Sequence, residues 1–184
     1  GMRSRRIKTD RRDVVALTDA CRTGTYRPVH RRSAEQRPRQ QTLVAREQLV
    51  RTRTRAIAGL RALTRSVGAR VPRATSERFL GRLAAQPLPD ELRTTLQPLA
   101  DLVAFTTHAL EALDGALLTI ARSDATCQRL MTAPSIGPVT AVAFVAALDD
   151  PRRFRHASQV AQYLGLVPRE YSSGELQRRG HVVR

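Results

Sequence analysis

A mainly α-helical fold is predicted for this chain of 184 residues. It consists of long antiparallel coiled-coil-like helices, followed by a small helical domain with a helix-hairpin-helix-like turn. The first observation is a proline-free segment over 40–67 with apolar residues at steps of seven, four, three and four. The second is a segment over 99–131 in which every such step is three or four. An apolar content of 41% is enough to bury a core and excludes simple disorder.

The first half of the chain is predicted to contain a short helix and a long one. A helix over 10–22 ends near Gly24, a residue suited to a helix C-terminus. Residues 25–38 contain two prolines and are expected to form a loop. The long arginine-rich helix over 40–67 then ends at Gly68 and Pro72. Its apolar stripe consists of Leu49, Ala56, Leu60, Leu63 and Val67.

The second long helix is expected to begin after Pro87 and Pro89, with Asp90 as its N-cap and Pro98 as a site for a kink. Its stripe consists of Leu99, Val103, Thr106, Leu110, Leu113, Leu117, Ile120, Asp124, Cys127 and Met131. Two such helices joined by a proline-containing turn favour an antiparallel pair. We expect a second copy of the chain to complete it, so that the protein is a homo-oligomer; a monomeric bundle is the alternative.

The last third of the chain changes in character. A tight turn, Pro-Ser-Ile-Gly-Pro, precedes an apolar helix over 139–148, which Asp149-Asp150-Pro151 stops. A basic loop surrounds Phe154, and Ser158 is expected to cap a short helix that runs through Leu164 and ends at Gly165. The tail over 168–184 has no helical period.

The positive charge lies at the two ends of the chain. The formal net charge is +16, from 32 Lys and Arg against 16 Asp and Glu. Residues 1–73 have 20 basic and 5 acidic residues, residues 74–150 have 5 and 9, and residues 151–184 have 7 and 2. Arginine bias in the genome would explain Arg over Lys but not this segregation. Such a charge predicts a polyanionic partner, which is DNA, RNA or an anionic membrane surface. We interpret the two ends as nucleic-acid contacts and the middle segment as a scaffold or oligomerisation element.

Several classes of protein are excluded. The chain has no run of apolar residues long enough for a membrane span, so we expect no membrane partner. Its two cysteines give no disulfide framework, which fits a cytoplasmic location. Its four histidines are far apart without a zinc motif. No Walker loop or G-x-G-x-x-G motif points to nucleotide binding.

Three short motifs have the residue types needed for chemistry. Asp10 and Asp13 lie at i and i+3, so both face one side of a helix, where they suit either a divalent cation or a simple N-cap. The turn with Ser135 and Gly137 suits either phosphate binding by backbone N–H groups or plain packing. A serine in Ser172-Ser173-Gly174 suits either a nucleophile or an ordinary turn.

Together and in this order, these segments resemble the DEDD-type insertion-sequence transposases. The resemblance rests on Lys8-Thr9-Asp10-Arg11-Arg12-Asp13, the arginine-rich helix, the Pro-Ser-Ile-Gly-Pro turn, Phe154 in its basic loop, Tyr163-Leu164-Gly165-Leu166-Val167-Pro168 and Ser172-Ser173-Gly174. In that family a RuvC-like domain is followed by a coiled coil and a C-terminal serine-bearing transposase domain, and some members are bridge-RNA-guided recombinases. The resemblance implies a remnant of the RuvC-like domain over 1–30, the coiled-coil region over 31–131 and part of the transposase domain over 132–184.

The resemblance also implies roles for single residues. Asp10 and Asp13 match the third and fourth acidic residues, which hold Mg²⁺, and Ser173, in preference to Ser172, matches the catalytic serine. The implied DNA-binding residues are Lys8, Arg11, Arg12, Ser135, Gly137, Arg152, Arg153 and Arg155. The other two acidic residues of the family have no counterpart here, so we expect a fragment that lacks both ends of the full enzyme.

The resemblance implies that the complete enzyme acts in DNA transposition by metal-assisted attack of the serine on a DNA phosphate, with DNA and in some members a guide RNA as partners. With only part of that active site, this chain is expected to bind nucleic acid and dimerise without cleaving. The alternative is a non-catalytic basic helical protein that binds nucleic acid, or that only dimerises through its coiled coil.

Overall fold

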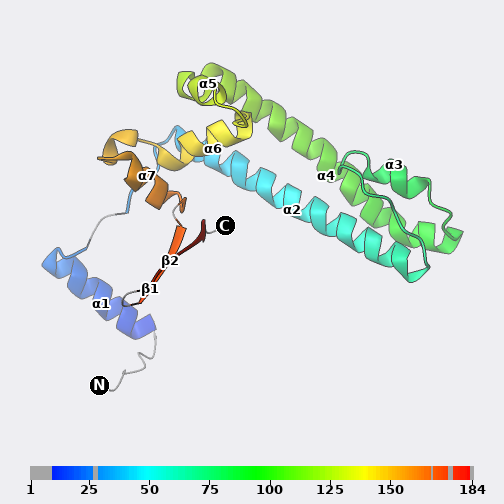
Figure 1. The fold of residues 1–184 in the computed structure, drawn as a ribbon, viewed down its shortest axis with the longest axis horizontal. Helices are drawn as coiled ribbons and strands as arrows, with labels where there is room; N and C mark the ends of the chain where they lie inside the picture. The colour runs from blue at the N-terminus through cyan, green and yellow to red at the C-terminus, as the bar shows by residue number, and fades with distance from the viewer. Residues whose placement is uncertain (1–9, 27–28, 167, 174–175, 183–184) are drawn as a thin grey trace. The chain divides into compact units, whose positions relative to one another are not determined.

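The computed structural model describes residues 10–26, 29–166, 168–173 and 176–182, with backbone alone for residues 10–12 and beyond 166. The predicted mainly helical fold is confirmed (Figure 1). The chain divides into two compact units, Gly1–Arg32 and Ser33–Arg184. The elements are α1 Asp10–Thr23, α2 Gln36–Ser66, α3 Phe79–Ala84, α4 Asp90–Ser123, α5 Ala125–Met131, α6 Pro138–Leu148, the 3₁₀ turn η1 Pro151–Arg153, α7 Ala157–Tyr163, β1 Pro168–Ser173 and β2 Leu176–Val182.

Helix α1 belongs to the first unit, and it ends where the sequence indicates. Gly24 has a φ of 67°, the left-handed conformation that glycine adopts at a helix C-terminus without strain. The N–H of Thr25 donates to the carbonyl of Ala20, which closes the last turn. The helix therefore begins and ends within one residue of the prediction.

Helix α2 begins four residues earlier than predicted. Residues 36–38 were expected to belong to a loop because of Pro38, but they form the first turn of the helix. Proline is tolerated there because the first N–H groups of a helix have no partner inside it. The hydroxyl of Ser33 accepts a hydrogen bond from the N–H of Gln36 at 3.2 Å and so satisfies one of those groups.

Helices α2 and α4 lie side by side and run in opposite directions (Figure 1). The order of their polar contacts shows this direction. From the start of α2 to its middle, Arg39 contacts Asp124, Arg46 contacts Asp114, and Arg53 contacts Thr107. The predicted antiparallel pair is therefore present within one chain.

Two apolar clusters fill this part of the protein. The first lies between α2, α3 and α4 and is made of Ala56, Leu60, Val71, Phe79, Leu83, Leu88, Leu96 and Val103. The second lies where α4, α5 and α6 meet and is made of Leu117, Ala121, Cys127, Ala141 and Val142. The predicted stripe on α4 is confirmed, because Val103, Thr106, Leu110 and Leu117 are all buried.

The predicted stripe on α2 is only partly right. Ala56 and Leu60 are buried, but Leu63 is 39% exposed and Val67 is 49% exposed. Thr64 is fully buried in their place, because its hydroxyl donates to the carbonyl of Arg61 at 3.1 Å. A threonine satisfied inside its own helix behaves as a small apolar residue, and this moves the buried face by one position.

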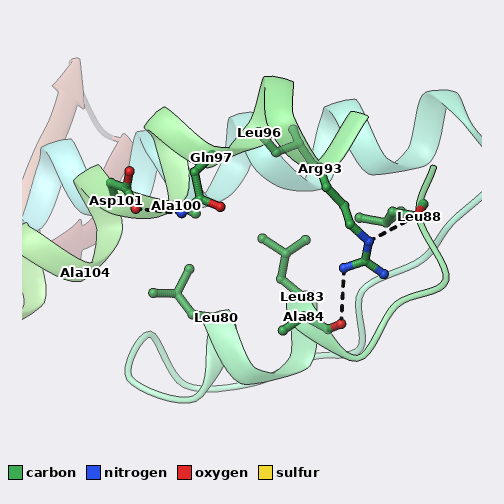
Figure 2. A pocket seen from close by; sticks show the side chains of 10 residues that line it. All are labelled: Leu80, Leu83, Ala84, Leu88, Arg93, Leu96, Gln97, Ala100, Asp101 and Ala104. Carbon is green, nitrogen blue, oxygen red and sulfur yellow. Dashed lines mark hydrogen bonds between the residues drawn. The ribbon is translucent and has the colours of Figure 1, made fainter. Parts of the chain in front are cut away.

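Helix α3 was not predicted, and it packs on the N-terminal part of α4. Its residues Leu80 and Leu83 face Leu96 across a hollow of about 310 Å³ (Figure 2). Arg93 of α4 closes one end, because its guanidinium donates to the carbonyls of Ala84, Gln86 and Leu88 at 3.5, 2.6 and 3.2 Å. Arg93 thereby holds the loop between α3 and α4, while Gln97 donates to Asp101 of the same helix at 2.7 Å.

Helix α4 starts at Asp90, with Pro89 in the capping position, so Asp90 is the first helical residue rather than the predicted N-cap. The helix continues through Pro98 to Ser123. Its stripe was predicted to continue in one helix to Met131, but Asp124 interrupts it. The backbone there is extended, with φ −101° and ψ 114°, and α5 begins at the next residue.

Asp124 holds this junction together. Its carboxylate accepts hydrogen bonds from the N–H groups of Thr126 at 2.8 Å and Cys127 at 3.1 Å, which caps α5. It also pairs with Arg39 of α2 at 2.7 Å, and the two side chains are only 15% and 13% exposed. Burial opposes ionisation, but the hydrogen bonds outweigh it, and the pKa of Asp124 falls below its usual value. Burial raises the pKa of the neighbouring Cys127 thiol.

After α6 the chain forms η1, α7 and a hairpin. Helix α7 begins at Ala157 with His156 in the capping position, two residues before the predicted cap Ser158, and Gly165 follows it with a φ of 69° as expected. The tail, for which no element was predicted, forms the antiparallel pair β1 and β2. No described helix is long and apolar enough to cross a membrane.

Candidate nucleic-acid interface

The acidic pair of the sequence lies at the start of α1. Asp10 is the first residue of the helix and Asp13 lies one turn further on, with an exposed side chain. The helical spacing expected for these two carboxylates is therefore present. Arg11 and Arg12 lie between them on the same helix, and Lys8 lies outside the described residues.

The Pro-Ser-Ile-Gly-Pro segment forms the predicted turn between α5 and α6. Ser135 is exposed and has a φ of 67°, an uncommon value for a residue other than glycine. Gly137 occupies the N-cap position of α6 and Pro138 the first helical position, and no side chain caps this end. The first N–H groups of α6 therefore lack a capping side chain, which is the local arrangement that suits an anion.

A basic loop follows the other end of α6. Helix α6 ends at Leu148, Asp149 has a φ of 59°, and Asp150 caps η1 by accepting from the N–H of Arg152 at 2.9 Å. Arg152 and Arg155 are exposed. The N–H of Arg155 donates to the side-chain oxygen of Gln159 at 2.8 Å, which joins the loop to α7. These contacts order the backbone while the two guanidinium groups face solvent.

Arg153 differs from its two neighbours. Its guanidinium carbon lies 4.7 Å from the ring centroid of Phe154 and 4.4 Å from that of Tyr163 in α7. The two rings are themselves 5.3 Å apart. One guanidinium nitrogen of Arg153 is buried without a hydrogen-bond partner. The side chain is thus partly buried against two rings, whereas Arg152 and Arg155 are exposed, and its predicted role in DNA binding stays a prediction.

The turn and the basic loop are not brought together. They lie at opposite ends of α6, which has 11 residues and so spans about 16 Å. One phosphate cannot contact both ends of the helix. A nucleic acid that touches both must lie along α6, so these residues make two contact points and not one pocket.

The serine pair lies at the tip of the C-terminal hairpin. Ser173 is the last residue of β1 and pairs with Leu176, and Ser172 pairs with Gln177. Gly174 lies outside the described residues. Among the described residues, no three His, Cys, Asp or Glu side chains gather as they would around a metal ion.

Comparison with known proteins places these residues in context. Residues 127–184, which include the turn, the basic loop and the serine pair, match the transposase IS116/IS110/IS902 family. The resemblance to the insertion-sequence transposases is confirmed. The alignments with the relatives described next cover nearly the whole chain.

Two curated relatives illustrate the match. A protein named as a probable family 20 transposase from Pseudomonas aeruginosa is 34% identical over 181 residues, or 95% of this chain and 54% of its own length. The transposase for insertion sequence element IS1111A from Coxiella burnetii is 29% identical over 188 residues, or 96% of this chain and 51% of its own. The chain thus spans about half the length of the curated relatives it matches. No solved structure matches it.

Proposed function

We propose that this chain acts in the transposition of an insertion element, as the part of a transposase that binds DNA. The observation that carries the proposal is the family match over residues 127–184, because it covers all the candidate groups of the C-terminal third. The exposed arginines of the basic loop support the same reading. Contacts of this kind position a DNA backbone without reading its sequence.

The proposed DNA contacts run along α6. At one end, we place a first phosphate beside the N–H groups of Val139 and Thr140, in the first turn of α6, and the hydroxyl of Ser135. At the other end, Arg152 and Arg155 contact a second. Arg153 has a structural task, because it supports the loop by packing on Phe154 and Tyr163.

The proposed chemistry belongs to the two motifs at the chain's ends. Ser173 is the proposed nucleophile. Its hydroxyl oxygen loses its proton and bonds to a DNA phosphorus, and the ester bond from that phosphorus to the neighbouring nucleotide breaks. The released sugar oxygen takes up a proton as a free hydroxyl, and the other part of the strand stays linked to the serine through the phosphate. Asp10 and Asp13 are the residues that would hold Mg²⁺, because carboxylate oxygens are ligands that this ion prefers. One or two protein carboxylates are enough when a phosphate of the substrate is also a ligand. When bound, Mg²⁺ neutralises charge on the phosphate oxygens.

The test is capture of covalent DNA. Labelled duplexes from the element's ends are incubated with the protein, with and without Mg²⁺, and separated under denaturing conditions. Because this chain offers only part of the active site that the resemblance implies, we expect it to bind the duplexes without forming an adduct. An adduct lost in Ser173→Ala and Asp13→Asn would overturn that expectation, provided that two matched controls retain it. The controls are Ser172→Ala and Asp19→Asn, which changes an exposed carboxylate on the same helix. A chain that binds no DNA would count against the proposed function.

A second copy of the chain and a guide RNA remain proposals about partners. Leu102 and Phe105 on α4 are 37% and 67% exposed and lie one turn apart, which supports association through the long helices. Light scattering should report a dimer or larger species that Phe105→Glu converts to monomer. For the RNA, transcripts from the element's non-coding ends should bind more tightly than RNA of the same length and shuffled sequence.

A further inference from the structure

Four arginines surround a hollow at the C-terminal end of α2. The hollow has a volume of about 520 Å³ and is lined by Arg61, Arg65, Arg70, Val71 and Arg73. Arg61 and Arg65 belong to the last turns of α2, and the other three residues follow in the loop toward α3. Only Val71 of this lining is apolar, and it is buried in the first core cluster.

No acidic group balances this charge. Residues 48–76 have seven arginines and neither Asp nor Glu. Within the described part of the chain, none of the four guanidinium groups around the hollow forms an ion pair with a carboxylate. Glu77, the next acidic residue along the chain, is paired with Arg53 at 3.4 Å. Four like charges around one hollow repel one another, so an anion placed between them is attracted by all four.

The arginines are not needed to end the helix. Basic side chains near a helix C-terminus often bond its last carbonyls. Here backbone N–H groups bond the last carbonyls of α2. Gly68, with a φ of 79°, donates its N–H to the carbonyl of Arg65 at 3.0 Å, and the N–H of Ala69 donates to the carbonyl of Thr64 at 3.1 Å. This is the Schellman arrangement, and it leaves the guanidinium groups available.

One of the four is held in place. The guanidinium of Arg61 lies over the ring of Phe79, 5.3 Å from its centroid, and Phe79 is fully buried. The Nε of Arg61 is itself buried and has no hydrogen-bond partner in the described residues. A guanidinium fixed on a buried ring loses little freedom when it binds a ligand, whereas Arg65, Arg70 and Arg73 are exposed.

We propose that this hollow is a second nucleic-acid site, which binds phosphates of a polynucleotide backbone through Arg65, Arg70 and Arg73 beside the fixed Arg61. The choice of a polynucleotide as the source of the phosphate rests on the proposed function. The only ring at the site, Phe79, is buried, so no aromatic face is available to stack on a base. Binding here is therefore independent of base sequence.

The test compares two triple variants that lose the same charge. One is Arg65→Ala with Arg70→Ala and Arg73→Ala. The other changes three exposed arginines elsewhere, Arg55→Ala with Arg82→Ala and Arg122→Ala. Affinity for a labelled 30-base-pair duplex is measured by fluorescence anisotropy over a range of salt concentrations. Since each phosphate contact contributes about 0.9 to the salt slope, the first variant should lower it by about 2 to 3 and weaken binding at least tenfold.

The outcomes separate the two proposals. A slope lowered equally by both variants would overturn the site, because the arginines would then act only through total charge. A wild-type chain that binds no nucleic acid would overturn the proposed function as well, whereas wild-type binding with an unaffected pocket variant overturns only the site. Circular dichroism checks that the variants fold, and Arg70→Gln with Arg73→Gln, both outside the helix, is the milder substitute.

The same binding assay also compares duplex DNA with duplex RNA and tests free phosphate as a competitor. DNA and RNA duplexes of one sequence, and a shuffled sequence of each, should lose affinity to the same degree in the pocket variant. Inorganic phosphate should compete no better than chloride at equal ionic strength. Stronger competition would assign the hollow to free phosphate and overturn the polynucleotide site.

Discussion

The junction between α4 and α5 should depend on one carboxylate. Replacing Asp124 by alanine removes two N-cap hydrogen bonds and the ion pair with Arg39. Loss of the cap costs about 1 kcal/mol. Loss of a mostly buried partner costs up to about 3–5 kcal/mol, but Arg39 keeps a second contact, with Glu35 at 2.8 Å, so we take about 2 kcal/mol for it. The free energy of unfolding should therefore fall by about 3 kcal/mol.

Asparagine at the same position separates the two contributions. It caps a helix about as well as aspartate does, so Asp124→Asn should lose only the ion pair and cost about 2 kcal/mol. Urea unfolding followed by circular dichroism at pH 7 measures both variants against the wild type. If Asp124→Ala changed the free energy of unfolding by less than about 0.5 kcal/mol, the reasoning would be refuted.

The same carboxylate predicts a pH dependence. Its pKa in the folded protein lies below the ordinary value of 3.8, so the folded state favours the ionised form. The stability it contributes is fully present above the ordinary pKa and is lost as pH falls through the lower folded value. The gap between wild type and Asp124→Asn should hence be constant from pH 7 to about 5 and close below pH 4. A gap that widens with acid would contradict the assignment.

Three further predictions concern side chains whose roles differ from what their type suggests. Cys127 is fully buried and its thiol pKa is raised, while Cys21 is exposed. Ellman's reagent at pH 8 should therefore react with one thiol in the folded protein and with two in urea. Two rapidly reacting thiols in the folded protein would contradict the burial of Cys127. Arg153→Ala removes two cation–π contacts and should lower the free energy of unfolding in urea by about 1–2 kcal/mol, with no change in the salt slope of DNA binding. Arg152→Ala should lower that slope and leave the free energy of unfolding unchanged. The reverse pattern would show that Arg153, and not Arg152, contacts DNA. Arg93→Ala should cost about 1 kcal/mol, because three backbone carbonyls lose a charged donor, and an equal cost for the exposed Arg82→Ala would show that the loss is one of charge alone.

The sequence predicts the long elements well because their periodicity extends over many turns. The stripe from Leu99 to Leu117 is long enough that its buried positions could be assigned correctly, and Gly24 and Gly165 mark helix ends by their conformational freedom. The start of α2 was placed too late because Pro38 breaks a helix in its middle but not in its first turn. Such boundaries depend on contacts such as that of Ser33, which periodicity does not reveal.

Candidate site residues were harder to predict than the fold. Arg152, Arg153 and Arg155 are equivalent in a charge count. The folded chain distinguishes Arg153, because it places this side chain against the rings of Phe154 and Tyr163. The hollow around Arg61 was missed for a similar reason. The sequence shows that residues 48–76 contain no acidic residue. It does not show that the arginines at the end of α2 and those in the following loop surround one hollow, because this depends on how the chain turns at Gly68.

The antiparallel order of α2 and α4 also sets how the chain closes on itself. Arg53 and Thr107 are 54 residues apart in sequence, Arg46 and Asp114 are 68 apart, and Arg39 and Asp124 are 85 apart. Each step away from the loop encloses a longer segment, and closing 85 residues in place of 54 costs about 0.4 kcal/mol more in chain entropy. We therefore expect the pair to zip from the arginine-lined hollow toward Asp124. The surface on which α6 packs is then completed last, so the segment that matches the transposase family docks onto helices that have already formed.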